Sequence, residues 1–195
     1  MEPITKQADF AMASRSLQER VESGHDWIHA LDMPFSEYEL FLSTNMGKYA
    51  AWSLFYPVTQ LMIIWQSVAS GVRWRNDELM RYRTERYEKV KVLVKAELDR
   101  VNGIRTRLET AFQDATLPDI NYPRAERVVL RAMEQVGVNL AEYIDTIDQI
   151  TQWVDRLWFG QYIDIHVKNE IFVEIQQSIS TIKRYRYRKF KGDSA

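Results

Sequence analysis

The spacing of apolar residues is helical along most of the chain. It is clearest from residue 123 to residue 158, where apolar side chains recur at alternating intervals of four and three. This alternation is typical of a long helix that packs against other helices, and the additional apolar residue Ile144 favours a bundle over a two-stranded coiled coil. The recurring positions are Val129, Met133, Val136, Leu140, Tyr143, Ile147, Ile150, Val154 and Leu157.

Two more long helices are predicted, one on each side of this segment. The first runs from about residue 57 to residue 115, and Gly71 and Gly103 are points where it bends or divides. The second begins near Tyr162, after Gly160, and carries an apolar stripe of isoleucine and valine into the C-terminal segment. Short connections between such helices favour antiparallel packing.

Before residue 57 the helical pattern is shorter. One amphipathic piece covers residues 8–21 and another covers residues 36–55, where Ser36 and Glu39 have the spacing of a helical capping box. The sequence shows no strand signal and no internal repeat.

These patterns predict an all-α fold: long antiparallel helices in a bundle or helical hairpin, with extended N- and C-terminal arms. The expected organisation is an N-terminal arm with a short helix at residues 1–35, a helical bundle domain at residues 36–182 and a basic aromatic tail at residues 183–195. Only 7 Gly and 5 Pro interrupt the chain, which suits long helices.

Composition excludes several classes of protein. Apolar residues make up 46% of the chain and charged residues 27%, which is enough apolar surface for a core and rules out a wholly disordered chain. There is no cysteine, so disulfides, thiolate catalysis and cysteine-based zinc sites are excluded.

A stretch without charge at residues 49–72, between Lys48 and Arg73, has the length of a membrane-spanning helix. It also contains Pro57, Gln60 and Gln66, and spanning helices are usually more uniformly apolar. A helix buried in a protein bundle is the favoured interpretation, and contact with a membrane through residues 49–72 is the alternative.

The tail at residues 183–191, KRYRYRKFK, concentrates positive charge in a chain whose net charge is −1. Six of its nine residues are cationic and three are aromatic. In an extended conformation the alternation puts Arg184, Arg186 and Arg188 on one side and Tyr185 and Tyr187 on the other. Such a run suits an anionic polymer or surface, and a tail that only increases solubility is the alternative.

A second basic and aromatic segment occupies residues 73–91. The planar guanidinium group of arginine can bind two oxygens of a phosphate, and aromatic rings can stack on bases. The predicted nucleic-acid-binding residues of the two segments are Arg73, Arg75, Arg81, Arg83, Arg86, Lys89, Lys183, Arg184, Arg186, Arg188, Lys189 and Lys191. The predicted stacking or interface residues are Trp74, Tyr82, Tyr185 and Tyr187.

Charge alternates along the chain in four blocks. Residues 1–56 carry −4, residues 57–112 carry +4, residues 113–182 carry −6 and residues 183–195 carry +5. Acidic faces of one copy could therefore meet basic faces of the next, which predicts self-association. The alternative for the middle blocks is an ordinary set of solvated helix faces.

No catalytic motif accompanies these segments. His25 and His29 have the i, i+4 spacing of metal ligands, but no second motif completes a site, so surface histidines are expected. The acidic residues along the 123–158 helix occupy polar positions and are expected on a solvated or interhelical face. They are Glu142, Asp145, Asp148 and Asp155. We therefore predict no catalytic residue, no metal, no cofactor and no enzymatic activity.

The basic segments at 73–91 and 183–191, with their interleaved Tyr and Trp, resemble the design of helical coat (nucleocapsid) proteins of filamentous viruses, including the archaeal rod-shaped and lipothrix-like DNA viruses. The resemblance implies a structural subunit that assembles with itself or with a paralogous partner. It also implies sequence-independent binding of DNA or RNA through the phosphate backbone, and a place in the virion after assembly in the host cytoplasm. The acidic balance of residues 113–182 departs from a uniformly basic coat.

Two alternatives remain open from the sequence. The chain could be a membrane-associated or virion-internal helical protein, or a helical accessory subunit of a larger complex. A tail that meets anionic headgroups would support the first of these.

Overall fold

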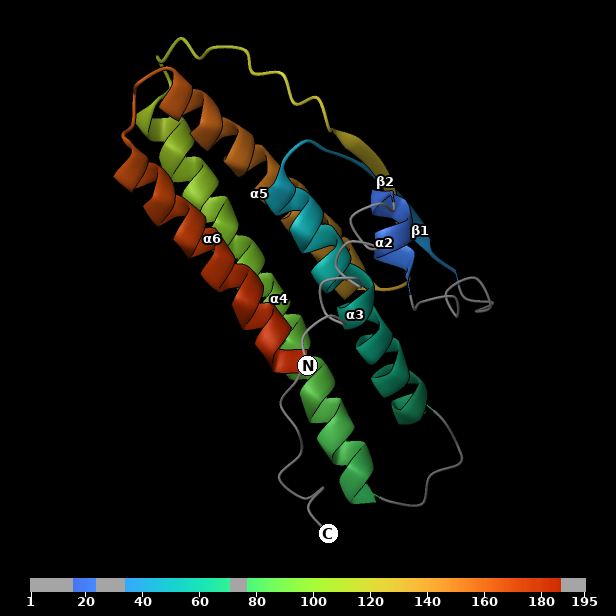
Figure 1. Cartoon of the computed structure of the whole chain (residues 1–195). Coiled ribbons are helices and arrows are strands. Elements are labelled where there is room, and N and C mark those ends of the chain that lie inside the picture. Colours follow the sequence, from blue (N-terminus) through green and yellow to red (C-terminus); the bar gives the residue numbers. More distant parts are fainter. Residues whose placement is uncertain (1–15, 24–33, 71–76, 187–195) are drawn as a thin grey trace, which may run out of the picture.

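The computed structural model describes residues 16–23, 34–70 and 77–186, and within them the side chains of 64–70, 77–80 and 186 are left out of the description. This part of the chain is mainly helical, with one small two-stranded sheet (Figure 1). In chain order the elements are α2 (Leu17–Glu22), β1 (Ser36–Leu42), α3 (Asn45–Ser70), α4 (Asp77–Ala111), β2 (Glu126–Ala132), α5 (Gln135–Phe159) and α6 (Ile165–Arg186).

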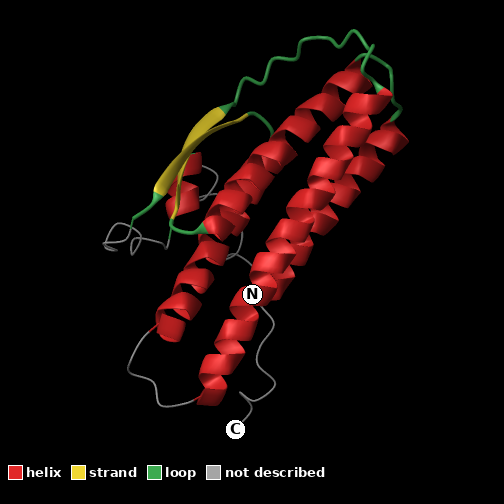
Figure 2. Ribbon diagram, turned by 180° about the vertical axis from the view of Figure 1, so that it is seen from behind, coloured by secondary structure: helices red, strands yellow, loops and turns green. Residues whose placement is uncertain are grey.

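The helices α4, α5 and α6 run side by side along the long axis, and α3 lies beside α5 (Figures 1 and 2). The predicted seam of α5 is confirmed, because its members from Val136 to Leu157 are buried. Opposite it, α4 contributes the buried residues Val94, Val101 and Ile104. The mainly helical class is therefore as predicted.

The two strands contradict the prediction of helix at residues 36–42 and 126–132. In both segments alternate residues are buried: Leu40 and Leu42 in β1, and Val128 and Leu130 in β2. That is the period of a strand with one face on a core. Val129 matched the heptad of α5 in sequence but points to the outer face of β2 instead.

Helix boundaries also differ from those predicted. Pro57, expected near the start of a helix, is buried inside α3. α3 ends at Ser70 and α4 begins at Asp77, on either side of Gly71, where a division was expected. The capping box expected at Ser36 lies within β1. A capping box is found at the start of α2 instead, where Ser16 and Glu19 bond each other's backbone N–H groups.

The strands and the helices that follow them form a structural repeat that the sequence analysis did not find. The two strand–helix units are offset by 90 positions, since Ser36 matches Glu126 and Asn45 matches Gln135. Glu39 is paired with Val129, its own equivalent, so the antiparallel ribbon is centred on a near two-fold axis. Few side chains are shared between the units, which hides the repeat in sequence.

The repeat places two glycines where α3 and α5 cross below the ribbon. A Cβ atom on Gly47 would overlap the Asp148 carboxylate of α5, and one on its equivalent Gly137 would lie 2.9 Å from the Cβ of Ala132 and 3.5 Å from Thr59 of α3. α5 therefore approaches the first turn of α3 so closely that only glycine leaves the space at position 47. At position 137 the close neighbour is Ala132 of β2, and α3 lies at an ordinary van der Waals distance.

Asp148 fills that space on one side with a buried carboxylate. Its Oδ1 accepts hydrogen bonds from the Thr44 backbone N–H (2.8 Å) and the Thr44 hydroxyl (2.7 Å). Its Oδ2 accepts from the Ser43 N–H (3.0 Å) and from the Gln152 side chain (2.7 Å). An acidic group in this position satisfies backbone donors at the N-terminus of α3 and complements the helix dipole. The side chain is 1% exposed, so of the two predicted locations, a solvated or an interhelical face, Asp148 occupies the interhelical one.

Replacing Asp148 tests this junction. Asp148→Ala leaves the donors of Ser43 and Thr44 buried without an acceptor, so we expect the free energy of unfolding to fall by about 3 kcal/mol. Urea denaturation followed by circular dichroism measures this change. Glu142→Ala, on an exposed face of the same helix, is the control and should change stability by less than about 0.5 kcal/mol. Equal effects of the two substitutions would contradict the assigned role.

Candidate nucleic-acid interface

The first half of α4 carries a row of cationic side chains. Arg81 and Lys89 are exposed, and Arg83 and Arg86 are partly buried. No ion pair joins Arg81, Arg83 or Lys89 to another residue in the described part of the chain. These charges remain available to an external anion.

The C-terminal end of α6 packs against this row. The Arg86 guanidinium lies 4.7 Å from the centre of the Tyr185 ring and donates a hydrogen bond of 3.3 Å to the Tyr185 carbonyl. Arg86 also lies 5.6 Å from the Tyr82 ring. The contact joins segments 99 residues apart in sequence. The two predicted basic zones thus meet at one surface, and exposed Arg184 is beside the contact in sequence.

Several of the predicted residues hold the fold together. Lys183 donates to the Tyr49 hydroxyl (3.0 Å) and lies over the Tyr49 ring. Tyr82 and Tyr185, predicted to stack on bases or to lie at an interface, both contact Arg86. In the described structure these two rings therefore position a cation.

Other predicted residues lie outside the described part of the chain. Arg73, Trp74 and Arg75 belong to residues 71–76, and the histidine pair His25 and His29 belongs to residues 24–33. The remaining ones are Tyr187, Arg188, Lys189 and Lys191, together with the side chain of Arg186.

A buried polar network that was not predicted from the sequence lies between α4, α5 and α6. The Tyr143 hydroxyl is 2.7 Å from the Ser178 hydroxyl, which donates to the Glu97 carboxylate at 2.6 Å. Burial raises the pKa of Tyr143 above its ordinary value, although the bond to Ser178 acts in the opposite direction. Ser178 is fully buried, so the network stabilises helix packing and offers no substrate access. The signal in the sequence was Glu97, which interrupts the apolar line of α4.

Asp155 and Asp145 also have structural partners. Asp155 accepts a hydrogen bond from the Tyr122 hydroxyl (3.1 Å) and pairs with Lys168 (2.8 Å). Burial, and then the neighbouring charge of Asp148, raise the pKa of Asp145, whose carboxylate accepts a bond from Gln149 (2.7 Å). The expected interhelical role fits Asp155.

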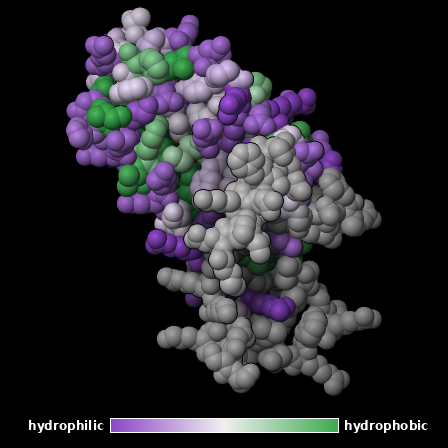
Figure 3. Space-filling view, viewed as in Figure 1, coloured by the Kyte–Doolittle hydropathy of each residue, from purple (hydrophilic) through white to green (hydrophobic). Residues whose placement is uncertain are grey.

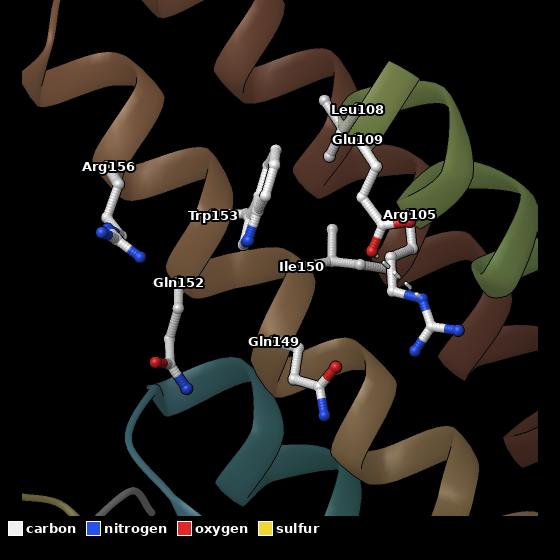
Figure 4. Close-up of a pocket in the computed structure, with 8 residues that line it drawn as sticks. All are labelled: Arg105, Leu108, Glu109, Gln149, Ile150, Gln152, Trp153 and Arg156. Atoms are coloured by element: carbon white, nitrogen blue, oxygen red, sulfur yellow. Dashed lines mark ion pairs between the residues drawn. The ribbon is translucent and has the colours of Figure 1, made fainter. Parts of the chain in front are cut away.

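A cavity of about 230 Å³ lies between α4 and α5 (Figure 4). Trp153 stands at its centre in the view, with Arg105 on α4 and Arg156 on α5 at its sides. Arg105 pairs with Glu109 (3.7 Å), and Arg156 donates to the Pro118 carbonyl (2.9 Å). Sites for organic ligands usually exceed about 300 Å³. With its charges already paired, this cavity is a packing gap between helices.

Apolar side chains gather on the surface where α5 ends and α6 begins, at the upper left of Figure 3. Phe159 is 62% exposed, and Tyr162, Ile165 and Val173 are each more than two-fifths exposed. Several large apolar side chains exposed at one end of the molecule are typical of a surface that contacts another protein.

The described residues form neither a metal-binding cluster nor a membrane-spanning helix. No group of three or more His, Cys, Asp or Glu side chains there could hold a metal ion, and His166 is exposed. No described helix has the length and apolar character needed to cross a bilayer.

Comparison with known proteins gives a fold and no function. No protein-family model matches the chain, and no curated protein matches it. The crystal structure of selenomethionine-containing AcaB from uropathogenic E. coli is similar, with a TM-score of 0.59 and 16% sequence identity. The match covers 79% of this chain and 78% of AcaB. At that identity the similarity establishes the shared fold alone.

The contact between Arg86 and Tyr185 can be tested by two substitutions. Tyr185→Leu removes the ring under the guanidinium, so we expect the last turn of α6 to open more often and its amides to exchange hydrogen about fivefold faster. Tyr185→Phe keeps the ring and should exchange at nearly the original rate. Hydrogen exchange measured by mass spectrometry distinguishes them, and equal rates for both variants would contradict a ring-based contact.

Proposed function

We propose that this protein is a non-enzymatic structural subunit that binds nucleic acid through its phosphate backbone and associates with copies of itself, as a coat protein of a filamentous virus does. The observation that carries the proposal is the contact of Arg86 with Tyr185, which brings two basic segments to one surface. Arg81, Lys89 and Arg184 are exposed in these segments.

The chemistry of this surface suits a polyanion better than a small ligand. Its cationic side chains are spread along α4 and the end of α6. The cavities found beside the described helices are not centred on these cations. Lysine and arginine on an open surface bind phosphates by replacing condensed counterions, without reading sequence. The binding would serve DNA and RNA alike.

Self-association is supported by the exposed apolar end of α5 and α6 and by the alternating charge blocks of the sequence. In this proposal the helices form an antiparallel bundle. Leu17 and Val21 of α2 are buried in the core and residues 183–186 belong to α6, so the proposed arms between copies are residues 1–15 and 187–195. The protein would then reside in the virion and, before assembly, in the host cytoplasm. A membrane role for residues 49–72 is not included, because residues 53–59 of α3 are buried against protein.

Charge reversal tests the nucleic-acid surface. The triple variant Arg81→Glu, Lys89→Glu and Arg184→Glu should bind a 30-base-pair duplex of random sequence at least tenfold more weakly, because three phosphate contacts become repulsive. Fluorescence anisotropy at fixed salt measures the affinity.

The matched control makes the same charge change on the second half of α4. Lys95→Glu, Arg105→Glu and Arg107→Glu remove exposed or half-exposed cations that pair with acidic neighbours. We expect this variant to lose less than threefold in affinity. A loss as large as that of the first triple variant would mean that binding follows net charge, and the proposed surface would be wrong.

A second candidate function is sequence reading of DNA by the ribbon of β1 and β2. The ribbon lies on the outside of the helices with its outer face to solvent (Figure 2), and a two-stranded antiparallel ribbon has the width of the major groove of B-form DNA. Its near two-fold axis would suit a palindromic site. Arg127 and Arg131 are its cations, but they pair with Glu39 (2.6 Å) and Glu37 (3.1 Å), which leaves the outer face neutral.

The double variant Arg127→Ala and Arg131→Ala separates the two candidates. If the helical surface binds the phosphate backbone, affinity for random duplex DNA should stay within about twofold of the original. Selection of bound sequences from a random library gives the second readout. Enrichment of a motif that disappears in the double variant would favour ribbon reading over the first proposal.

A further inference from the structure

The outer edge of β2 is closed by a side chain. Gln18 of α2 accepts a hydrogen bond from the Val129 N–H (2.8 Å) and donates one to the Val129 carbonyl (3.2 Å). The next outward N–H, that of Arg131, donates to the Tyr56 hydroxyl (3.3 Å). The amide of Gln18 thus takes the place of a neighbouring strand.

The outer edge of β1 has no such cover in the described part of the chain. Val129 directs its backbone polar groups away from β1, so its register partner Glu39 directs its own away from β2. The same holds for Glu37 and Phe41, two positions to either side. No hydrogen bond from a described residue reaches the outward groups of these three residues. An open edge of this kind pairs readily with another strand.

The side chains of this edge restrict the strand that it accepts. Glu37 and Glu39 pair across the ribbon with Arg131 and Arg127, yet their side chains are still 52% and 60% exposed on the β1 side. Phe41 is 67% exposed on the same face. Two β1 strands paired antiparallel about Glu39 or Tyr38 would place glutamates opposite each other, which is destabilising. The edge therefore favours a cationic strand over a second β1.

The chain contains such a strand pattern at residues 187–191, directly after α6. If this segment is extended and runs antiparallel to β1, Tyr187 lies opposite Phe41, Lys189 opposite Glu39 and Lys191 opposite Glu37. Each of these cross-strand pairs is favourable. In Figures 1 and 2 the end of α6 lies across the helices from the ribbon, which favours the ribbon of a neighbouring copy.

We propose that the β1 edge of one copy accepts residues 187–191 of a second copy as a third strand. The proposal rests on the self-association in the proposed function and names its contact. Donor and acceptor surfaces differ, so the contact is head-to-tail, and it extends into a chain of copies unless its rotation closes a ring.

The test uses the chain without residues 187–195 as acceptor and a peptide of residues 183–195 as donor, with no nucleic acid present. Titration followed by NMR should shift the backbone amides of Glu37, Glu39 and Phe41. In the acceptor Glu37→Lys/Glu39→Lys the dissociation constant should rise about tenfold. A peptide with Lys189→Glu and Lys191→Glu should recover most of that loss, which separates charge pairing from damage to the fold.

Glu39→Pro tests the main chain. The proline ring removes an N–H that points away from β2, so the ribbon keeps its own hydrogen bonds. We expect the variant to bind the peptide more weakly than Glu39→Gln, which loses the charge but keeps the N–H. Binding equal to that of Glu39→Gln would overturn strand pairing.

Sedimentation of the full chain gives the assembly readout. Association that falls when residues 187–195 are deleted supports the proposal, and unchanged association overturns it. Peptide shifts confined to α4 would also overturn it. If the full chain is monomeric and its β1 amides no longer respond to the peptide, the segment docks within its own chain and the contact between copies is wrong. These experiments contain no nucleic acid, so a failure of the strand contact can be distinguished from a failure of nucleic-acid binding.

Discussion

The close crossing of α3 and α5 beneath the ribbon is the constraint on which the remaining structure depends. Glycine at position 47 lets α3 start against α5, and the Asp148 carboxylate binds the two residues just before the first turn of α3. The crossing sets the two strands side by side in register, so the ribbon follows from it. α4 and α6 pack along α5 and also contact α3, and the end of α6 meets the first half of α4 at Arg86 and Tyr185.

Helix packing could be predicted from the sequence because its signal is local and repeated. The seam of α5 persisted over several turns, so its burial was recognised even though the helix begins at Gln135 and not near residue 123. The strands were missed because each is short and because Val129 and Met133 extended the heptad of α5 by coincidence. The two-fold repeat was missed because it rests on glycine placement and burial, with little identity between the units.

The basic segments were evident from the sequence, but it was not evident which of their cations are held within the fold and which are exposed. Sequence alone gave no reason to expect that Arg86 and Lys183 would be held by tyrosines while Arg81 and Lys89 remain exposed. That difference depends on which residues the fold brings together across 99 positions. The roles of Asp148 and Glu97 likewise depend on partners from other helices.

The salt dependence of DNA binding tests the central claim most directly. If the joined surface of α4 and α6 neutralises about four phosphates, a plot of log affinity against log salt concentration should have a slope of about −3 or steeper. The slope should be the same for duplexes of unrelated sequence. A slope between 0 and −1, or no measurable binding at low salt, would contradict the account.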